Sequence, residues 1–167
     1  MKKLLITLSL ILGATPILAE NIDVTGTVQS RCTVNVDTPG YYGNPNAYTL
    51  TTLPASAGQE PIIRFDTTLA NAYFGQVSYP TAFTSSPSLP DTVAWSGAVT
   101  VAQASLSDMG GYQAASTTSG SMRQYIFTHA GTVWIKSTSV VTYGGGQNKA
   151  FPGGSYKAVV LAQCIAQ

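Results

Sequence analysis

Residues 21–36 read NIDVTGTVQSRCTVNV, and their side chains alternate between two faces. A period of two residues predicts a β-strand with one buried face. The stretch Asn21–Ser30 places apolar or small side chains at its even positions, namely Ile22, Val24, Gly26, Val28 and Ser30. The pattern continues to Val36 and stops at the turn residues DTPG at 37–40. Two interpretations fit: an ordinary first strand of a β-sandwich, or a strand that inserts into a neighbouring molecule.

Short strand patterns recur along the rest of the chain, separated by turns rich in Gly, Pro and Ser. The clearest lie at Ile62–Thr68, Thr92–Ala102, Met122–Thr128, Thr132–Tyr143 and Ser155–Ile165. Because no pattern indicates a long helix or an internal repeat, the expected fold is an all-β sandwich of about eight or nine short strands. The sequence also predicts a bulge or break at Gly97, and a hairpin that joins Met122–Thr128 to Thr132–Tyr143.

Residues 1–19, MKKLLITLSLILGATPILA, have the three parts of a secretory signal peptide. Lys2 and Lys3 form the positive region, Leu4–Leu12 the apolar run, and Ala19 the small residue before the expected cleavage. The apolar run is too short to span a bilayer, and no stop-transfer pattern follows that would favour an uncleaved anchor. We therefore expect an exported chain that begins near Glu20, with no membrane span in its mature part.

Charge is sparse, at 9% of residues. Without Lys2 and Lys3, six basic residues face seven acidic ones, which gives a net charge of about −1. Such a surface is a poor match for nucleic acid or anionic lipid. Two cysteines, Cys32 and Cys164, predict one disulfide in an exported chain, with two free thiols as the alternative.

Few residues could support catalysis or hold a metal or cofactor. The single histidine, His129, lies in a predicted turn, and no nucleophile-elbow pattern accompanies it. Gly144–Gly146 lacks the Lys-Ser/Thr of a phosphate-binding loop and is expected to be a turn. Because these patterns are missing, the sequence predicts neither an enzyme nor a cofactor. The scattered carboxylates are Asp23, Asp37, Glu60, Asp66, Asp91 and Asp108. A possible carbohydrate-stacking set comprises Tyr41, Tyr42, Trp95, Tyr112, Tyr125 and Trp134.

Three stretches carry a resemblance that covers most of the mature chain. They are ENIDVTGTV (Glu20–Val28), LPDTVAWSGAVTVAQASLSDMGGYQA (Leu89–Ala114) and GGSYKAVVLA (Gly153–Ala162). In order and spacing the chain resembles the major pilins of class-5 (alpha-type, colonisation-factor) fimbriae, which are assembled by the alternate chaperone–usher route. The resemblance implies a signal peptide at 1–19, a donor-strand extension at 20–30 and a pilin domain at 31–167.

In that family an immunoglobulin-like sandwich lacks its last strand, and a periplasmic chaperone fills the groove temporarily. At the outer-membrane usher, the N-terminal strand of the next subunit replaces the chaperone, and repetition builds a surface fibre for adhesion or biofilm formation. The resemblance therefore implies three kinds of partner: copies of this chain, a chaperone and usher, and a tip adhesin. The inserting residues would be Ile22, Val24, Gly26, Val28 and Ser30, with Gly26 allowing close backbone approach. The cysteines depart from the family pattern, because its major pilins generally lack them.

Two other functions stay open from the residues alone. One is a monomeric secreted sandwich that binds carbohydrate through exposed tyrosine and tryptophan. The other is an exported hydrolase that depends on His129.

Overall fold

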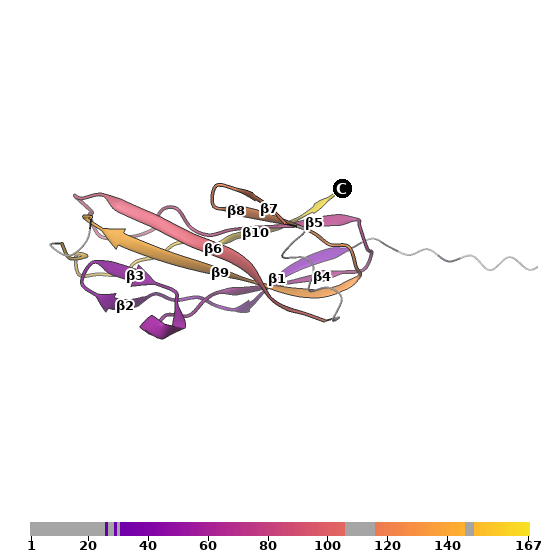
Figure 1. Ribbon diagram of the computed structural model, residues 1–167, viewed down its shortest axis with the longest axis horizontal. Helices are drawn as coiled ribbons and strands as arrows, with labels where there is room; N and C mark the ends of the chain where they lie inside the picture. Colours follow the sequence, from indigo (N-terminus) through magenta and orange to yellow (C-terminus); the bar gives the residue numbers. More distant parts are fainter. Residues whose placement is uncertain (1–25, 27–28, 30, 106–115, 146–148) are drawn as a thin grey trace, which may run out of the picture.

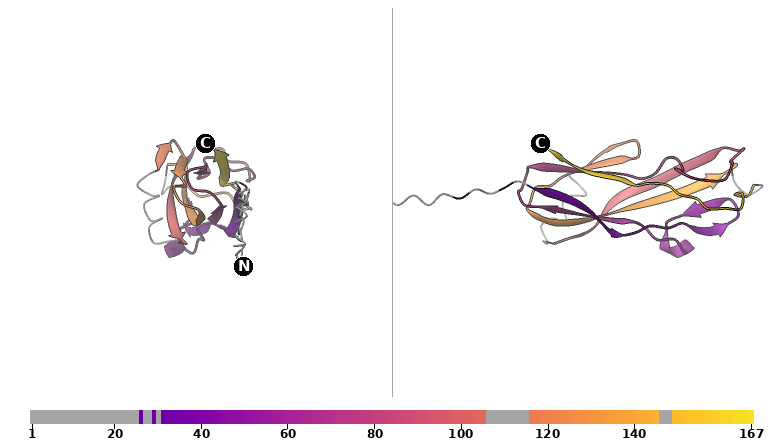
Figure 2. Two further views of the ribbon diagram at one scale, coloured as in Figure 1. Left: turned by 90° about the vertical axis from the view of Figure 1, so that its right-hand side faces the viewer. Right: turned by 180° about the vertical axis from the view of Figure 1, so that it is seen from behind.

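The computed structural model describes most of the chain beyond residue 25. The described residues are 26, 29, 31–105, 116–145 and 149–167. They form two antiparallel sheets in a sandwich that is elongated along the direction of its longest strands (Figures 1 and 2). The only helical element in this part of the chain is a 3-10 turn, Pro54–Ser56, so the predicted all-β sandwich is confirmed. No helix among these residues is long and apolar enough to cross a membrane.

The first sheet is organised around the long strand β9 (Gly131–Tyr143). Along one edge β9 pairs with β6 (Val93–Ala104) over nearly its whole length. On the other edge, its first half pairs with β4 (Ile62–Thr67) and its second half with β3 (Thr49–Thr51). Beyond β4 and β3 lie β1 (Cys32–Thr38), beside β4, and β2 (Gly43–Asn46), beside β3, while β6 forms the opposite edge of this sheet.

The second sheet has the order β10-β5-β8-β7. Its strands are β10 (Leu161–Ala166), β5 (Tyr73–Ser78), β8 (Met122–Ile126) and β7 (Thr117–Ser119). The predicted hairpin of Met122–Thr128 with Thr132–Tyr143 is wrong, because β8 and β9 belong to different sheets. Directly after β8 the side chain of Phe127 is fully buried between the sheets, and the short segment 127–130 crosses from one sheet to the other instead of forming a tight hairpin turn.

The predicted break at Gly97 is also wrong. β6 runs through Gly97, which pairs with Ser139, and its register shifts only between Val101 and Gln103. Gly97 is needed for packing, because a Cβ there would lie 2.6 Å from the ring of Tyr79. A glycine inside a strand can thus mark a close approach as well as a bulge.

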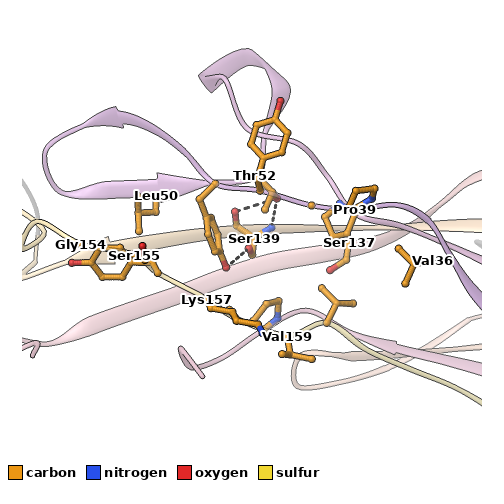
Figure 3. A pocket seen from close by; sticks show the side chains of 18 residues that line it. Val36, Pro39, Leu50, Thr52, Ser137, Ser139, Gly154, Ser155, Lys157 and Val159 are labelled. Atoms are coloured by element: carbon orange, nitrogen blue, oxygen red, sulfur yellow. Dashed lines mark hydrogen bonds between the residues drawn. The ribbon is translucent and has the colours of Figure 1, made fainter. Parts of the chain in front are cut away.

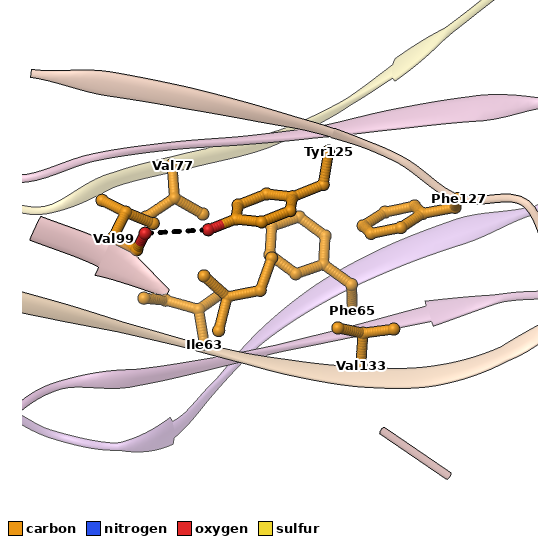
Figure 4. Close-up of a cluster of buried hydrophobic side chains, with 8 residues drawn as sticks. Ile63, Phe65, Val77, Val99, Tyr125, Phe127 and Val133 are labelled. Carbon is orange, nitrogen blue, oxygen red and sulfur yellow. Dashed lines mark hydrogen bonds between the residues drawn. The ribbon is translucent and has the colours of Figure 1, made fainter. Parts of the chain in front are cut away.

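A core of large side chains fills the half of the sandwich near the start of β1 (Figure 4). Phe65 and Phe127 pack with ring centroids 5.3 Å apart, and Phe127 lies against Gly75. The other members are Ile63, Val77, Val99, Tyr125, Val133 and Ile135. This packing holds the two sheets together in one half of the sandwich. The other half contains a groove between the sheets.

Candidate functional site

A groove of about 810 Å³ lies between the two sheets (Figure 3). One wall is the end of β1 and the residues after it, Val36–Tyr42, and the other wall is the extended segment 154–160. The floor comes from β9 and β3, with Leu50, Thr52, Ser137 and Ser139. Lys157 is the single charged residue among those that line the groove, so its surface is mostly apolar or neutral.

On the β1 wall, the side chain of Val36 faces the inside of the sandwich but remains exposed. Cys32 and Val34 pack against the core, and Val36 follows them on the same face by the period of two. Yet Val36 is 75% exposed. The amide of Thr68 in the β4 segment donates to the carbonyl of Arg31, so alternation turns the backbone groups of Val34 and Val36 away from β4 and toward the groove.

The opposite wall is an unpaired strand edge. The predicted strand Ser155–Ile165 is paired only from Leu161 onward, while Lys157 makes an isolated bridge to Ser85 on the side of β5. Alternation therefore points the backbone groups of Ala158 and Val160 into the groove. Within the described part of the chain, those two residues have no backbone hydrogen-bond partner.

Small polar side chains form the floor at the middle of β9. The backbone amide of Ser139 donates to the hydroxyl of Thr52 at 2.9 Å, and the hydroxyl of Ser139 donates to that of Tyr42 at 3.1 Å. Burial raises the pKa of Tyr42, while the Ser139 hydrogen bond acts in the opposite direction. Ser137 is 1% exposed, and its hydroxyl is buried without a hydrogen-bond partner among the described residues.

The predicted disulfide is present. Cys32 of β1 and Cys164 of β10 are bonded, with their Cα atoms 6.2 Å apart, and they tie the edge strands of the two sheets together. Val36 and Val160 are the groove-lining residues nearest the bridge along each wall. The disulfide therefore closes one end of the groove.

Most of the predicted inserting residues lie outside the described part of the chain. They are Ile22, Val24, Val28 and Ser30. Gly26 is described and exposed, and a Cβ added there would meet no atom within 4 Å. The segment 1–19 and the residues Asp23, Asp108 and Tyr112 also lie outside it.

The described candidates for catalysis each contact a neighbouring polar or charged side chain. His129 is half-buried at a bend, where its ring shares a 2.9 Å hydrogen bond with the hydroxyl of Thr128. The four described carboxylates are bound by polar or cationic groups: Asp37 by Trp134, Glu60 by Lys136, Asp66 by Arg64 and Asp91 by Lys149. No group of three potential metal ligands occurs among the described residues.

The tyrosines and tryptophans do not form one stacking surface in the described structure. Tyr125 is fully buried, whereas Tyr42 and Tyr41 line the groove, with Tyr41 59% exposed. Trp95 packs on Phe83 with ring centroids 4.7 Å apart, at the end of the sandwich far from the disulfide. Other aromatic rings continue this packing: Tyr143, Phe151 and Tyr156.

The groove floor is the part that the sequence analysis missed. The inward face of β9 reads Val133, Ile135, Ser137, Ser139 and Val141. Two serines on an otherwise apolar strand face indicate that less side-chain volume fills the core at this point. The sequence alone contains this signal. No family model, curated protein or solved structure matches the chain.

Proposed function

We propose that the chain is a structural subunit of a surface fibre, in which residues 21–30 of one copy occupy the groove of the next copy. The observation that carries this proposal is the groove itself, which lies between two unpaired strand edges. A strand placed there would hydrogen-bond to the edge of β1 on one side and to the segment 154–160 on the other. It would also cover the inward-facing Val36, which is 75% exposed.

The composition of the groove favours an uncharged, alternating strand. Its lining holds one charged residue, Lys157, which is exposed. Residues 21–30 match this surface, because their even positions are apolar or small and their one charge, Asp23, falls on the other face. Aliphatic side chains on one face of a strand fill pockets while the backbone supplies affinity.

A second copy is a better occupant than the chain's own extension. The hydroxyl of Thr68 donates to the carbonyl of Gln29 at 3.1 Å, and its amide donates to the carbonyl of Arg31 at 3.0 Å. These bonds continue the line of β1 past the disulfide, away from the groove. Filling its own groove would require the chain to reverse at Arg31 and to break both bonds.

Head-to-tail insertion of this kind does not close on itself and so gives an open filament. The resemblance to class-5 pilins supports the same arrangement, and it supplies the expected partners: a periplasmic chaperone, an outer-membrane usher and a cell-surface location. In this proposal no residue of the chain acts as a catalyst.

The test is deletion of residues 20–30 with the leader left in place, in a host that exports the chain. We expect exported subunits and no filaments by electron microscopy. A sharper version compares two double variants: V24D/V28D places charge on the inserting face, whereas T25D/T27D places the same charge on the outward face.

Only V24D/V28D should abolish filaments, because burying an unpaired carboxylate in the groove is energetically costly. Filaments from the deletion, or filaments of equal abundance from both double variants, would overturn the proposal. Immunoblots of the periplasm control for export and degradation of each variant.

A further inference from the structure

We infer that the Cys32–Cys164 disulfide is a stop that fixes the register of the inserted strand, with Gly26 of one copy opposite Tyr156 of the next. This inference rests on the proposed function, because it concerns the occupant of the same groove. It adds which residue meets which, and why insertion ends where it does.

The geometry at the disulfide excludes an intervening strand. Neighbouring strands lie about 4.8 Å apart, so two strands with a third between them are separated by about 9–10 Å. The Cα atoms of Cys32 and Cys164 are 6.2 Å apart. Beyond the groove, Val34 and Ala162 already pack against the core. An inserted strand must therefore end or turn outward at Val36 and Val160.

The direction of the inserted strand follows from its two ends. Along β1 the chain leads away from the disulfide, and along 154–160 it leads toward the disulfide. In the donating copy, only Arg31 separates Ser30 from the folded domain that begins at Cys32. This folded domain is too large to lie at the end that the disulfide closes, so it must lie at the open end of the groove. The N-terminal side of the inserted strand therefore lies at the disulfide. The strand is then antiparallel to 154–160.

The stop places the first apolar residue, Ile22, beside Val160. Steps of two residues along antiparallel strands then pair Val24 with Ala158 and Gly26 with Tyr156. The next pair is Val28 with Gly154.

The side-chain sizes independently favour this register, because a small residue faces a larger one at three successive positions. Tyr156 is held in place by packing on Phe83 and Phe151, with ring centroids 5.1 and 5.2 Å away. A glycine opposite such a ring leaves room for it, and the ring covers the bare backbone. A shift of two residues in either direction would set a branched valine, Val24 or Val28, against the ring of Tyr156.

The experiment uses the full chain with paired cysteine substitutions, expressed with its native export and assembly machinery. Directly opposite residues have Cβ atoms close enough for a disulfide. The variant V24C/A158C should give a ladder of multimers on non-reducing gels that collapses on reduction. The shifted pairs V24C/V160C and V24C/Y156C should give at least tenfold less disulfide-linked multimer. Mass spectrometry identifies the linked peptides.

A dominant ladder from a shifted pair would overturn the register and leave the fibre proposal standing. If the unmodified chain forms no filaments, the proposed function itself fails. In the background C32S/C164S, loss of the stop should raise the yield of the V24C/V160C ladder relative to the same pair in the parent, while the fit of Gly26 to Tyr156 still favours V24C/A158C. An unchanged preference there would contradict the role of the disulfide.

A second pair of variants needs no new cysteine. G26V directs a branched side chain at Tyr156, whereas T25V places the same valine side chain on the outward face. We expect G26V to reduce filament number at least tenfold and T25V to leave it unchanged. Equal filament numbers for the two variants would overturn the pairing of Gly26 with Tyr156.

Discussion

The hydroxyl of Tyr125 donates a 2.9 Å hydrogen bond to the backbone carbonyl of Val99, so that β8 of one sheet is joined to the edge strand β6 of the other. The side chain of Arg123 donates to the same carbonyl at 3.3 Å. Tyr125 is fully buried in the core (Figure 4). The two donors satisfy an acceptor on a strand edge that no neighbouring strand of the first sheet covers.

This tyrosine predicts a loss of stability in strong alkali. Burial raises the pKa of Tyr125 to about 12, although the nearby Arg123 acts in the opposite direction. Between about pH 10 and 12 the unfolded chain loses this proton and the folded chain keeps it, so the free energy of unfolding falls as the pH rises. Urea unfolding from pH 8 to 12 should show a decrease of about 2 kcal/mol attributable to this group. Y125F should lack that part of the decrease, and an identical pH profile for the variant would contradict the assignment.

Removal of the disulfide should lower stability strongly. Cys32 and Cys164 are 132 residues apart in the chain, so the bond restricts a very large loop in the unfolded state. We expect C32S/C164S to unfold with a free energy about 4–5 kcal/mol lower than that of the parent. Reduction of the parent protein is the matched control and should produce a similar loss. A difference below about 1 kcal/mol would show that the unfolded chain is already restricted by other contacts.

A comparison of two glycines tests the packing of the core. A Cβ at Gly75 would lie 2.3 Å from Cζ of Phe127, whereas a Cβ at Gly153 would meet nothing within 4 Å. G75A should therefore reduce the free energy of unfolding by about 1–3 kcal/mol, because Phe127 must leave its position. G153A should change it little. Thermal and urea unfolding of the two variants measure the difference, and equal stabilities would show that Phe127 can shift freely.

The two serines of the groove floor should respond to truncation with opposite signs. The buried hydroxyl of Ser137 has no hydrogen-bond partner among the described residues, so S137A removes a desolvated polar group. We expect it to raise the free energy of unfolding by about 1 kcal/mol. S139A removes the hydroxyl that donates to Tyr42 and should lower stability by a similar amount. Chemical unfolding of the purified protein checks both, and a loss of stability in S137A would indicate that its hydroxyl is hydrogen-bonded in solution.

The longer strands could be predicted from the sequence, whereas the short strands β2 and β7 fall in stretches that read as loops. Ile62–Thr68 was expected and β4 is Ile62–Thr67; Thr132–Tyr143 was expected and β9 is Gly131–Tyr143. The disulfide was also predictable, because two cysteines allow a single pairing within the chain. These features depend on residue type and on the period of two, both of which are local.

The assignment of strands to sheets and the groove could be decided only by the tertiary structure. β8 and β9 are consecutive in the chain but lie in different sheets, because Phe127 between them is buried in the core. The walls of the groove, Val36–Tyr42 and 154–160, are more than a hundred residues apart in the chain. The period of two residues predicts that the side chain of Val36 faces inward. Whether another residue covers that side chain depends on the distance between β1 and the segment 154–160, which the sequence does not give. Sequence alone thus specified the strands and their buried faces, whereas packing between distant segments decided that one of those faces is left uncovered.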